Sequence, residues 1–199
     1  DLVLLSARHK DAIVAVNKED KSLAWILGDP DGWGEEYQSY FFEPEGEDFE
    51  WFYAQHNVSI LDNGDIALFD NGTAKVKRDA GENRVSGDDV YSRAVVYSID
   101  TEKMTVSQVC EYGKERGADW YADWISGVVS LDGTKDHLWI TAGSHLHNAE
   151  ENRSDYYPKD MFVPGLTKTT HIDQIDNGEL SFELTISGDT YNALTYRSF

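Results

Sequence analysis

The chain of 199 residues has the composition of a folded globular protein, with 40% hydrophobic and 13% aromatic residues. Its 37 Asp and Glu residues outnumber 17 Lys and Arg residues, and the formal net charge of -20 repels phosphate backbones and anionic lipids alike. No stretch approaches the roughly 18 apolar residues of a spanning helix. We therefore expect no nucleic-acid partner and no membrane partner, and a site for an anionic substrate must supply its own local positive charge.

Short segments with alternating apolar residues dominate the chain, and a helical period is almost absent. This pattern predicts an all-β fold. One hairpin is especially clear, because Asp62-Asn63-Gly64-Asp65 separates two apolar runs. The only cysteine, Cys110, falls inside a predicted strand and excludes an internal disulfide. The predicted strands lie near residues 2–8, 12–17, 22–28, 56–61, 65–70, 92–99, 104–112, 125–131, 137–143, 168–174, 179–187 and 190–198.

A weak internal repeat groups these strands. A pair of strands that ends on glycine occurs three times, at Gly28, Gly113 and Gly188. The spacing suits four-stranded propeller blades that carry insertions, here residues 29–55 and 144–167. The second and third repeats then have four strands each, whereas the first has three and the last only a single strand. We therefore predict a partial β-propeller of about three four-stranded blades.

Such a partial propeller would leave sheet edges exposed, because a closed propeller has about 4–8 blades. Residues 1–199 are therefore expected to form the C-terminal portion of a larger propeller domain. The start at Asp1, which runs straight into an apolar segment, suggests a cut inside that fold. The missing blades would come from another chain, from residues outside this sequence or from further copies of the chain in a homo-oligomer. A complete small β-sandwich is the alternative architecture.

The segment from Asp48 to Thr73 holds the strongest candidate for chemistry. The aromatic residues from Phe49 to Tyr53 can wall a pocket or belong to the core, and Gln55-His56-Asn57 then places three polar side chains at the start of a predicted strand. A histidine at the mouth of a strand, behind a wall of aromatic residues, is a candidate nucleophile. The alternative is that His56 is an edge histidine whose ring binds a backbone carbonyl group.

Two further groups of residues are candidate sites. Arg8 closes the first predicted strand, and its guanidinium offers a fork of donors suited to a tetrahedral oxyanion. The alternative is an arginine in a surface turn. His145 and His147 lie on one face of an extended segment and suit zinc or copper, but the sequence places no evident third ligand nearby. We therefore assign no metal ligands.

Several segments together resemble a known family. The matches cover most of residues 2–113 and continue more loosely to Tyr196-Arg197. The matching segments are Ser6-Ala7-Arg8-His9, Trp25-Ile26-Leu27-Gly28-Asp29-Pro30, Trp51 to Asn57 with Asp62-Asn63-Gly64-Asp65, Phe69-Asp70-Asn71-Gly72 and Tyr91-Ser92-Arg93-Ala94-Val95. They resemble the bacterial arylsulfate sulfotransferases, six-bladed propeller enzymes that move sulfate between phenols without a nucleotide sulfate donor.

The resemblance implies a site and a reaction. The family's nucleophilic histidine matches His56, which would be sulfated transiently and then discharged onto an acceptor phenol. The family's sulfate-binding arginine matches Arg8, and Asn57, in the same matched segment as His56, is a further candidate for binding the substrate. The implied partners are small aryl sulfates and phenols, no cofactor is expected, and the family suggests a periplasmic or secreted location.

Some features of the family fall outside this sequence. Its His-x-Asn pair, a further histidine and an N-terminal β-sandwich all lie upstream of the matched region. A site built from these 199 residues alone is therefore incomplete, and we expect little or no turnover from this chain in isolation. The alternative function is a non-catalytic propeller that binds a partner or a glycan through its aromatic loops.

Overall fold

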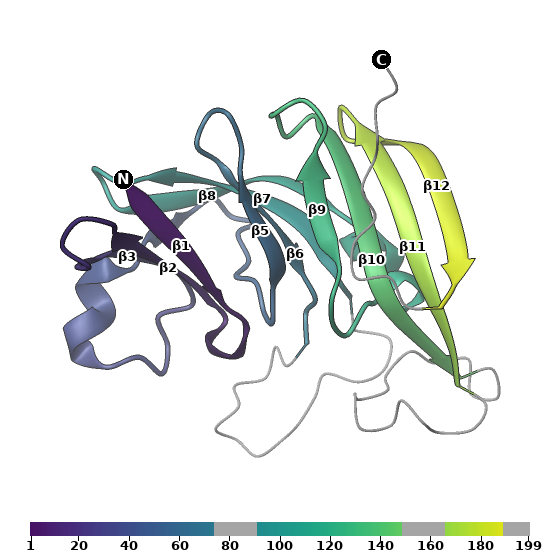
Figure 1. Ribbon diagram of the computed structural model, residues 1–199, viewed down its shortest axis with the longest axis horizontal. Coiled ribbons are helices and arrows are strands. Elements are labelled where there is room, and N and C mark those ends of the chain that lie inside the picture. Colours follow the sequence, from purple (N-terminus) through teal and green to yellow (C-terminus); the bar gives the residue numbers. More distant parts are fainter. Residues whose placement is uncertain (74–90, 149–165, 189–199) are drawn as a thin grey trace.

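The computed structural model describes residues 1–73, 91–148 and 166–188, and within these ranges the chain is all-β with a few short 3-10 helices (Figure 1). The prediction of an all-β fold is confirmed. Among the described residues, no helix has the length and apolar character needed to cross a membrane. The strands are β1 (Leu2–Ala7), β2 (Ala12–Asn17), β3 (Leu23–Gly28), β4 (Glu43–Glu45), β5 (His56–Ile60), β6 (Ile66–Asp70), β7 (Arg93–Asp100), β8 (Thr105–Tyr112), β9 (Gly127–Ser130), β10 (His137–Asn148), β11 (Leu166–Asp176) and β12 (Glu179–Ser187). The helices are η1 (Arg8–Lys10), η2 (Glu35–Tyr40) and η4 (Lys114–Trp120).

The strands form three separate sheets that lie side by side along the long axis of the molecule (Figure 1). The first sheet has the order β1-β2-β3, the second β4-β8-β7-β6-β5 and the third β12-β11-β10-β9. Neighbouring strands are antiparallel, except that the short β4 runs parallel to β8. Each sheet is therefore built mainly from strands that follow one another directly in the chain.

The sheets follow the predicted division into three groups but differ from it in detail. The second sheet has five strands where four were predicted, because residues 43–45, expected inside an insertion, pair with β8. The predicted insertion at 144–167 is also too long, since β10 and β11 continue their ladder past a bulge after Ala142. The strand predicted at 190–198 lies outside the described residues. The number of blades and the closure of a propeller remain predictions.

Strand β6, in the interior of the second sheet, is buried on both faces. Along β6, Ile66 and Leu68 pack into a cluster with the first sheet, whereas Ala67 and Phe69 pack into a cluster with the third sheet. The two sets alternate because successive side chains of a strand point to opposite faces. Burial on both faces explains why β6 has a continuous apolar run, and each large side chain buried there contributes about 1.5–3 kcal/mol.

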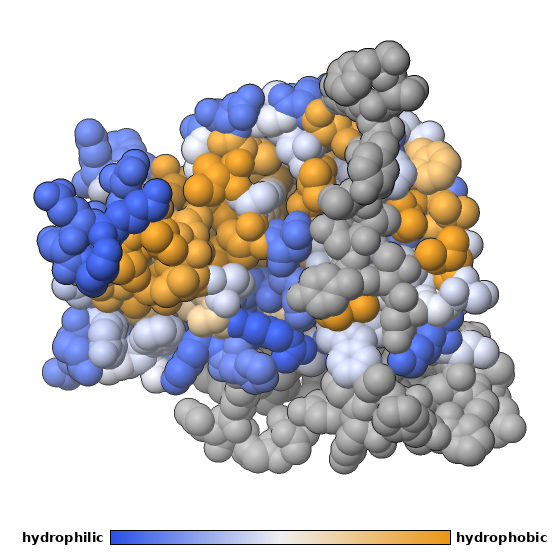
Figure 2. Space-filling model, in the orientation of Figure 1, coloured by the Kyte–Doolittle hydropathy of each residue, from blue (hydrophilic) through white to orange (hydrophobic). Residues whose placement is uncertain are grey.

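The two outer sheets each expose apolar side chains. On the first sheet, Leu2 and Leu5 of β1 are 41% and 52% exposed, and on the third sheet Phe182 and Leu184 of β12 are each 43% exposed. Figure 2 shows apolar side chains gathered on the surface over the first sheet and more of them at the side of the third sheet. Surface patches of this kind are typical of places where a protein contacts further protein.

The glycines that end the predicted strand pairs are required by the backbone. Gly28, Gly113 and Gly188 have positive φ angles of 149°, 106° and 105°. At Gly113 a second constraint applies, because a Cβ atom there would overlap the ring of Trp120. Trp120 is fully buried in the cluster between the second and third sheets, where it packs on Phe69. The turn after β8 therefore depends on the absence of a side chain.

Replacing Gly113 with alanine is expected to lower the free energy of unfolding by about 2–4 kcal/mol, since a strained backbone and a displaced indole ring both contribute. Gly178→Ala is the matched control, because Gly178 also has a positive φ, 83°, but has no atom within 4 Å of the position of a Cβ. Urea unfolding of both variants measures the difference. Equal losses of stability would contradict the contact with Trp120.

Candidate functional site

His56 opens β5 at an irregular point of its hairpin. It pairs with Phe69, but the next pair joins Ser59 to Ala67, so β5 carries one extra residue. Asn57 has a left-handed backbone with φ 50°, a conformation that asparagine adopts more readily than most residues. A bulge of this kind redirects neighbouring side chains and often lies beside an active site. It leaves His56 half-buried at the end of the strand.

Asn57 is exposed and joins two sheets. Its carboxamide oxygen accepts a hydrogen bond from the backbone N–H of Val128 on β9, at 3.2 Å. The side chain therefore links β5 of the second sheet to the third sheet. Its predicted contact with a substrate remains a prediction, and it would have to use the amide nitrogen, which the bond to Val128 does not occupy.

A buried carboxamide contacts the ring of His56. Nδ1 of His56 lies 2.7 Å from Oδ1 of Asn71. Asn71 follows β6 and is fully buried, and its amide nitrogen donates to the carbonyl oxygens of Ala122 at 2.7 Å and Ile125 at 3.0 Å. Asn71 therefore connects the candidate nucleophile to the backbone that leads into the third sheet.

Two hydrogen bonds link Asp11 and the first residue of β2 to the residues just before β5. The backbone N–H of Ala54 donates to Oδ1 of Asp11 at 2.6 Å. The buried side chain of Gln55 donates through Nε2 to the carbonyl oxygen of Ala12 at 2.9 Å. The turn between β1 and β2 is therefore attached to the residues that directly precede His56.

Arg8 lies in this turn, at the start of η1. The residue is half-buried, and its Nη2 donates to the backbone carbonyl of Asp123 at 3.4 Å. Its positive charge acts on the ring of His56, and this places the two predicted site residues in one electrostatic environment. The fold thus places Arg8 close enough for its charge to act on His56, although the two residues are far apart in the sequence.

The pKa of His56 is lowered from the ordinary histidine value of 6.5. Burial is the largest cause and the charge of Arg8 adds to it, while hydrogen bonds with Asn71 and with the backbone of Ala54 act in the opposite direction. The ring is therefore mainly neutral at pH 7 and keeps a lone pair on one nitrogen. A neutral imidazole beside a guanidinium is suited to attack on an anionic group.

Residues 121–126, which we call the junction segment, connect all three sheets at this site. Its backbone carbonyl groups accept hydrogen bonds from Arg8 after β1, from Thr73 after β6 and from His145 on β10. Ile125 in this segment has a positive φ of 50°, which is rare for a β-branched residue. Backbone strain of this kind concentrates at functional sites, where the surrounding contacts enforce it.

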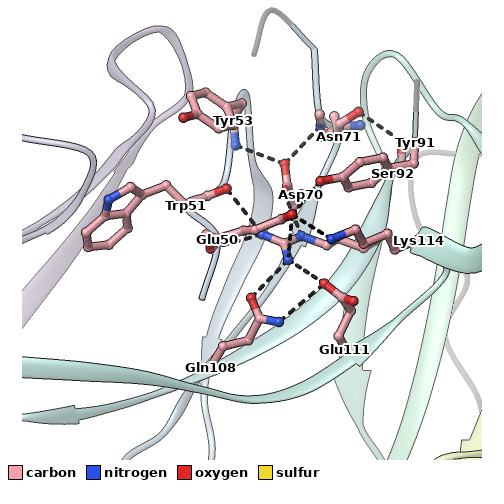
Figure 3. Close-up of polar contacts among 12 residues, drawn as sticks. Glu50, Trp51, Tyr53, Asp70, Asn71, Tyr91, Ser92, Gln108, Glu111 and Lys114 are labelled. Carbon is pink, nitrogen blue, oxygen red and sulfur yellow. Dashed lines mark hydrogen bonds and ion pairs between the residues drawn. The ribbon is translucent and has the colours of Figure 1, made fainter. Parts of the chain in front are cut away.

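A buried ion pair supports the chain that leads to β5 (Figure 3). Nε of Arg93 donates to Oδ2 of Asp70 at 2.9 Å, and neither side chain is exposed to solvent. Arg93 also donates to the backbone carbonyl oxygens of Glu50 at 3.1 Å and Trp51 at 3.2 Å. Asp70 accepts a hydrogen bond from the backbone N–H of Tyr53 at 2.9 Å. The pair therefore holds the backbone of residues 50–53, just before β5, against β6 and β7.

Further partners keep Arg93 charged in this buried position. It forms an ion pair with Glu111, and it donates to Oε1 of Gln108 at 2.9 Å and to the hydroxyl of Tyr97 at 3.2 Å. Burial acts to lower the pKa of Arg93, but Tyr97, Asp70 and Glu111 raise it overall. A guanidinium satisfied on all sides is the condition under which a buried charge is tolerated.

The aromatic residues before His56 belong to the core. Phe52 is fully buried between the first and second sheets, and Phe49 and Trp51 pack against the same cluster with ring centroids 4.7 Å apart. Tyr53 is half-buried, and burial together with nearby carboxylates raises its pKa to about 12. Of the two interpretations that the sequence left open for this segment, the structure favours the core over a pocket wall.

The histidines on the third sheet are arranged differently from the predicted pair. His145 is buried and packs against His171 of β11, with ring centroids 5.5 Å apart, and the side chain of His147 lies outside the described part of the structure. Burial, with His145 adding to it, lowers the pKa of His171 to about 4. Across residues 1–73, 91–148 and 166–188, no three His, Cys, Asp or Glu side chains come together as metal ligands.

Sequence reasoning assigned no role to Asn71, Asp70 or Arg93, although all three lie in the matching segments. The register of the hairpin formed by β5 and β6 indicates where these residues lie. Because β5 and β6 pair at His56 and Phe69, the residues after Phe69 must lie beside the residues before His56. A polar Asp-Asn pair directly after an apolar strand was therefore a candidate partner for the histidine.

The fold and the site define a class of protein: an all-β chain in which a histidine with a lowered pKa lies within the field of an arginine where neighbouring sheets meet. The sequence model of one protein family, described as Arylsulfotransferase (ASST), matches residues 1–197. The chain belongs to this family. The resemblance seen in the sequence is therefore confirmed over nearly the whole chain.

Curated relatives carry the name Arylsulfate sulfotransferase AssT. The relative from Escherichia coli O6:H1 is 30% identical over 215 residues, which cover 100% of this chain and 33% of the relative. The relative from Lelliottia amnigena is 31% identical over 186 residues, which cover 82% of this chain and 30% of the relative. The chain therefore spans about a third of the length of these relatives.

Replacing Arg93 with methionine is expected to lower the free energy of unfolding by about 3–5 kcal/mol, because Asp70 would remain buried without its counter-charge. Lys103→Met is the control. Lys103 pairs with Asp100 at 2.6 Å on the exposed surface, where an ion pair contributes little. Urea unfolding compares the two variants, and an Arg93 variant as stable as the control would show that the buried pair is dispensable.

Proposed function

We propose that this chain carries the nucleophile of an aryl sulfate sulfotransferase, in which His56 takes a sulfuryl group from an aryl sulfate and passes it to a phenol. One observation carries the proposal: the half-buried ring of His56 has a lowered pKa and lies within the field of Arg8. Membership of the arylsulfotransferase family supports the choice of aryl sulfates and phenols as substrates.

Each residue has a defined part in this reaction. A ring nitrogen of His56 forms a bond to sulfur while the bond from sulfur to the phenolic oxygen breaks, and the phenolate leaves. Arg8 donates hydrogen bonds to the sulfuryl oxygens, which the overall charge of -20 would otherwise repel. Asn57 donates from its amide nitrogen to the same group.

The second half of the reaction regenerates the histidine. The oxygen of the acceptor phenol forms a bond to sulfur, the nitrogen–sulfur bond breaks, and its electron pair returns to the ring. The acceptor phenol gives up one proton and the released phenolate takes one up, so the proton balance is closed through solvent. The covalent sulfohistidine separates donor and acceptor in time, and a nucleotide sulfate donor is not needed.

We also propose that the three sheets are blades of a larger propeller, of which this chain forms the C-terminal portion. The apolar side chains exposed on β1 and β12 support this, because further blades would cover them as the outer sheets cover the second sheet. On this account the site needs residues beyond this chain, and the chain alone has little or no turnover. A periplasmic or secreted location is proposed from the family resemblance.

Replacing His56 with alanine, in the longest form of the protein that contains this chain, is expected to reduce sulfuryl transfer by a factor on the order of 10⁴ or more, because the attacking nitrogen is lost. His137→Ala is the control, since His137 lies on the third sheet and pairs with Asp176 at 3.0 Å. Absorbance of the phenol released from a chromogenic aryl sulfate measures both. Transfer by the His56 variant at the wild-type rate would refute the assignment, and a wild-type protein without any transfer would favour a binding propeller.

The charge of Arg8 also affects how kcat/KM depends on pH. The neutral ring is the nucleophile, so kcat/KM is retained above the pKa of His56 and lost as pH falls through it, and this acid limb lies below 6.5 in the wild type. Arg8→Gln removes a charge that lowers this pKa, so the acid limb should move to higher pH. At pH 8, where the ring is neutral in both proteins, kcat should fall by about 10²- to 10³-fold, because a donor to the sulfuryl group is lost.

Lys10→Gln is the control for this pH profile. It removes a positive charge from the same short helix, but the ammonium group of Lys10 lies over the ring of Trp33, 5.7 Å from its centroid. The acid limb of this variant should match the wild type. An Arg8 variant with an unmoved acid limb would contradict the electrostatic coupling between Arg8 and His56.

A further inference from the structure

The orientation of the Asn71 side chain is determined by its own hydrogen bonds. Its amide nitrogen donates to two backbone carbonyl oxygens, those of Ala122 and Ile125 in the junction segment. A carbonyl oxygen accepts hydrogen bonds and does not donate them, so only the amide nitrogen of Asn71 fits there. The carboxamide oxygen must then be the atom that faces Nδ1 of His56, at 2.7 Å.

An oxygen that accepts from a ring nitrogen requires a proton on that nitrogen. Nδ1 of His56 is therefore the donor, and in the neutral ring the lone pair is on Nε2. We propose that Asn71 is a positioning residue that fixes the tautomer of His56 and so selects Nε2 as the atom that attacks sulfur. This proposal rests on the sulfuryl transfer proposed above, and it adds the identity of the attacking atom and the residue that selects it.

Asn71 is itself held from three directions. Its backbone carbonyl accepts a hydrogen bond from the hydroxyl of Ser92 at 2.9 Å, and the same hydroxyl accepts from the backbone N–H of Ala122 at 2.9 Å. The preceding residue, Asp70, is fixed by the buried pair with Arg93. A carboxamide anchored in this way cannot turn over to present its nitrogen to the histidine without leaving two buried carbonyl groups unsatisfied.

The proton on Nδ1 of His56 stays in place throughout the transfer of the sulfuryl group. When Nε2 forms the bond to sulfur and the phenolate leaves, the ring keeps its proton on Nδ1 and carries a positive charge. The hydrogen bond to Asn71 then becomes charge-assisted and strengthens. When the acceptor phenol takes the sulfuryl group, the electron pair returns to Nε2 and Nδ1 still holds the same proton. No proton has to leave Nδ1 at any stage.

An uncharged hydrogen-bond acceptor at position 71 keeps the ring of His56 neutral, whereas a carboxylate would not. An aspartate at position 71 would also accept from Nδ1, but its negative charge would favour the protonated ring and raise the pKa of His56. It would also bring two carboxylate oxygens against the carbonyl groups of Ala122 and Ile125, where the amide nitrogen now donates. The amide therefore fixes the proton on Nδ1 and leaves the ring neutral beside Arg8.

The protonation of the two ring nitrogens is directly measurable. In protein labelled with 15N-histidine, long-range 1H–15N correlation spectra distinguish a protonated ring nitrogen from one with a lone pair. His56→Ala identifies the signals of this residue. At pH 8 the wild type should show a protonated Nδ1 and a lone pair on Nε2. A proton on Nε2 in the wild-type protein would overturn the proposal, whatever the activity of the enzyme.

Variants at position 71 test whether the tautomer of His56 affects the rate of sulfuryl transfer. Asn71→Leu should lose the fixed tautomer and lower kcat by about 10- to 100-fold with a small change in KM for the aryl sulfate, the effect typical of losing a partner that orients a histidine. Asn71→Asp should keep the proton on Nδ1 but move the acid limb of the pH profile to higher pH. A wild-type tautomer and a wild-type kcat in Asn71→Leu would refute the role.

Thr170→Val is the matched control for loss of buried hydrogen bonding. The hydroxyl of Thr170 is buried between the backbone carbonyl oxygens of Gly143 and Gly188, each at 2.9 Å, and it makes no hydrogen bond to His56. This variant should lose stability but keep the tautomer and kcat. An equal fall of kcat in the Thr170 variant would show that general destabilisation, and not the tautomer, explains the Asn71 result. The spectra need no turnover, so failure of the proposed transfer is distinguishable from failure of this proposal.

Discussion

The buried pair of Asp70 and Arg93 is the interaction on which the site depends. Asp70 ends β6 and accepts hydrogen bonds from the backbone of Tyr53 and Gly72, so it fixes the chain on both sides of the hairpin. Arg93 neutralises it from β7, with neither side chain exposed. A buried charge that loses its partner is strongly destabilising, so this pair admits few alternative arrangements. The position of Asn71, one residue further along, follows from it.

The second sheet positions the residues of the site relative to this buried pair. Strand β6 is buried on both faces, and the polar residues Asp70 and Asn71 lie at and directly after its end, where the backbone needs partners outside the ladder. The junction segment supplies those partners and accepts bonds from all three sheets. The charge of Arg8, in the helix after β1, therefore acts on the ring of His56 in the second sheet and lowers its pKa.

The strands and the all-β fold could be predicted because alternation of apolar residues is a local property of the sequence. The short strand Glu43–Glu45 could not, since its three residues are exposed and carry no apolar pattern. A shared site for Arg8 and His56 was expected from family resemblance alone, because the hydrogen bonds that link their segments join residues distant in the sequence. The role of Asn71 and the pairing of His145 with His171 depend on long-range contacts and strand register, which residue types do not encode.

The most direct test of the account is the mass of the protein after brief mixing with a chromogenic aryl sulfate, followed by peptide mapping at mildly basic pH to preserve a nitrogen–sulfur bond. The experiment uses the longest form of the protein that contains this chain. The account predicts a gain of one sulfuryl group on the peptide that contains His56. Release of phenol with the adduct on another residue, or with no adduct on His56, would contradict it.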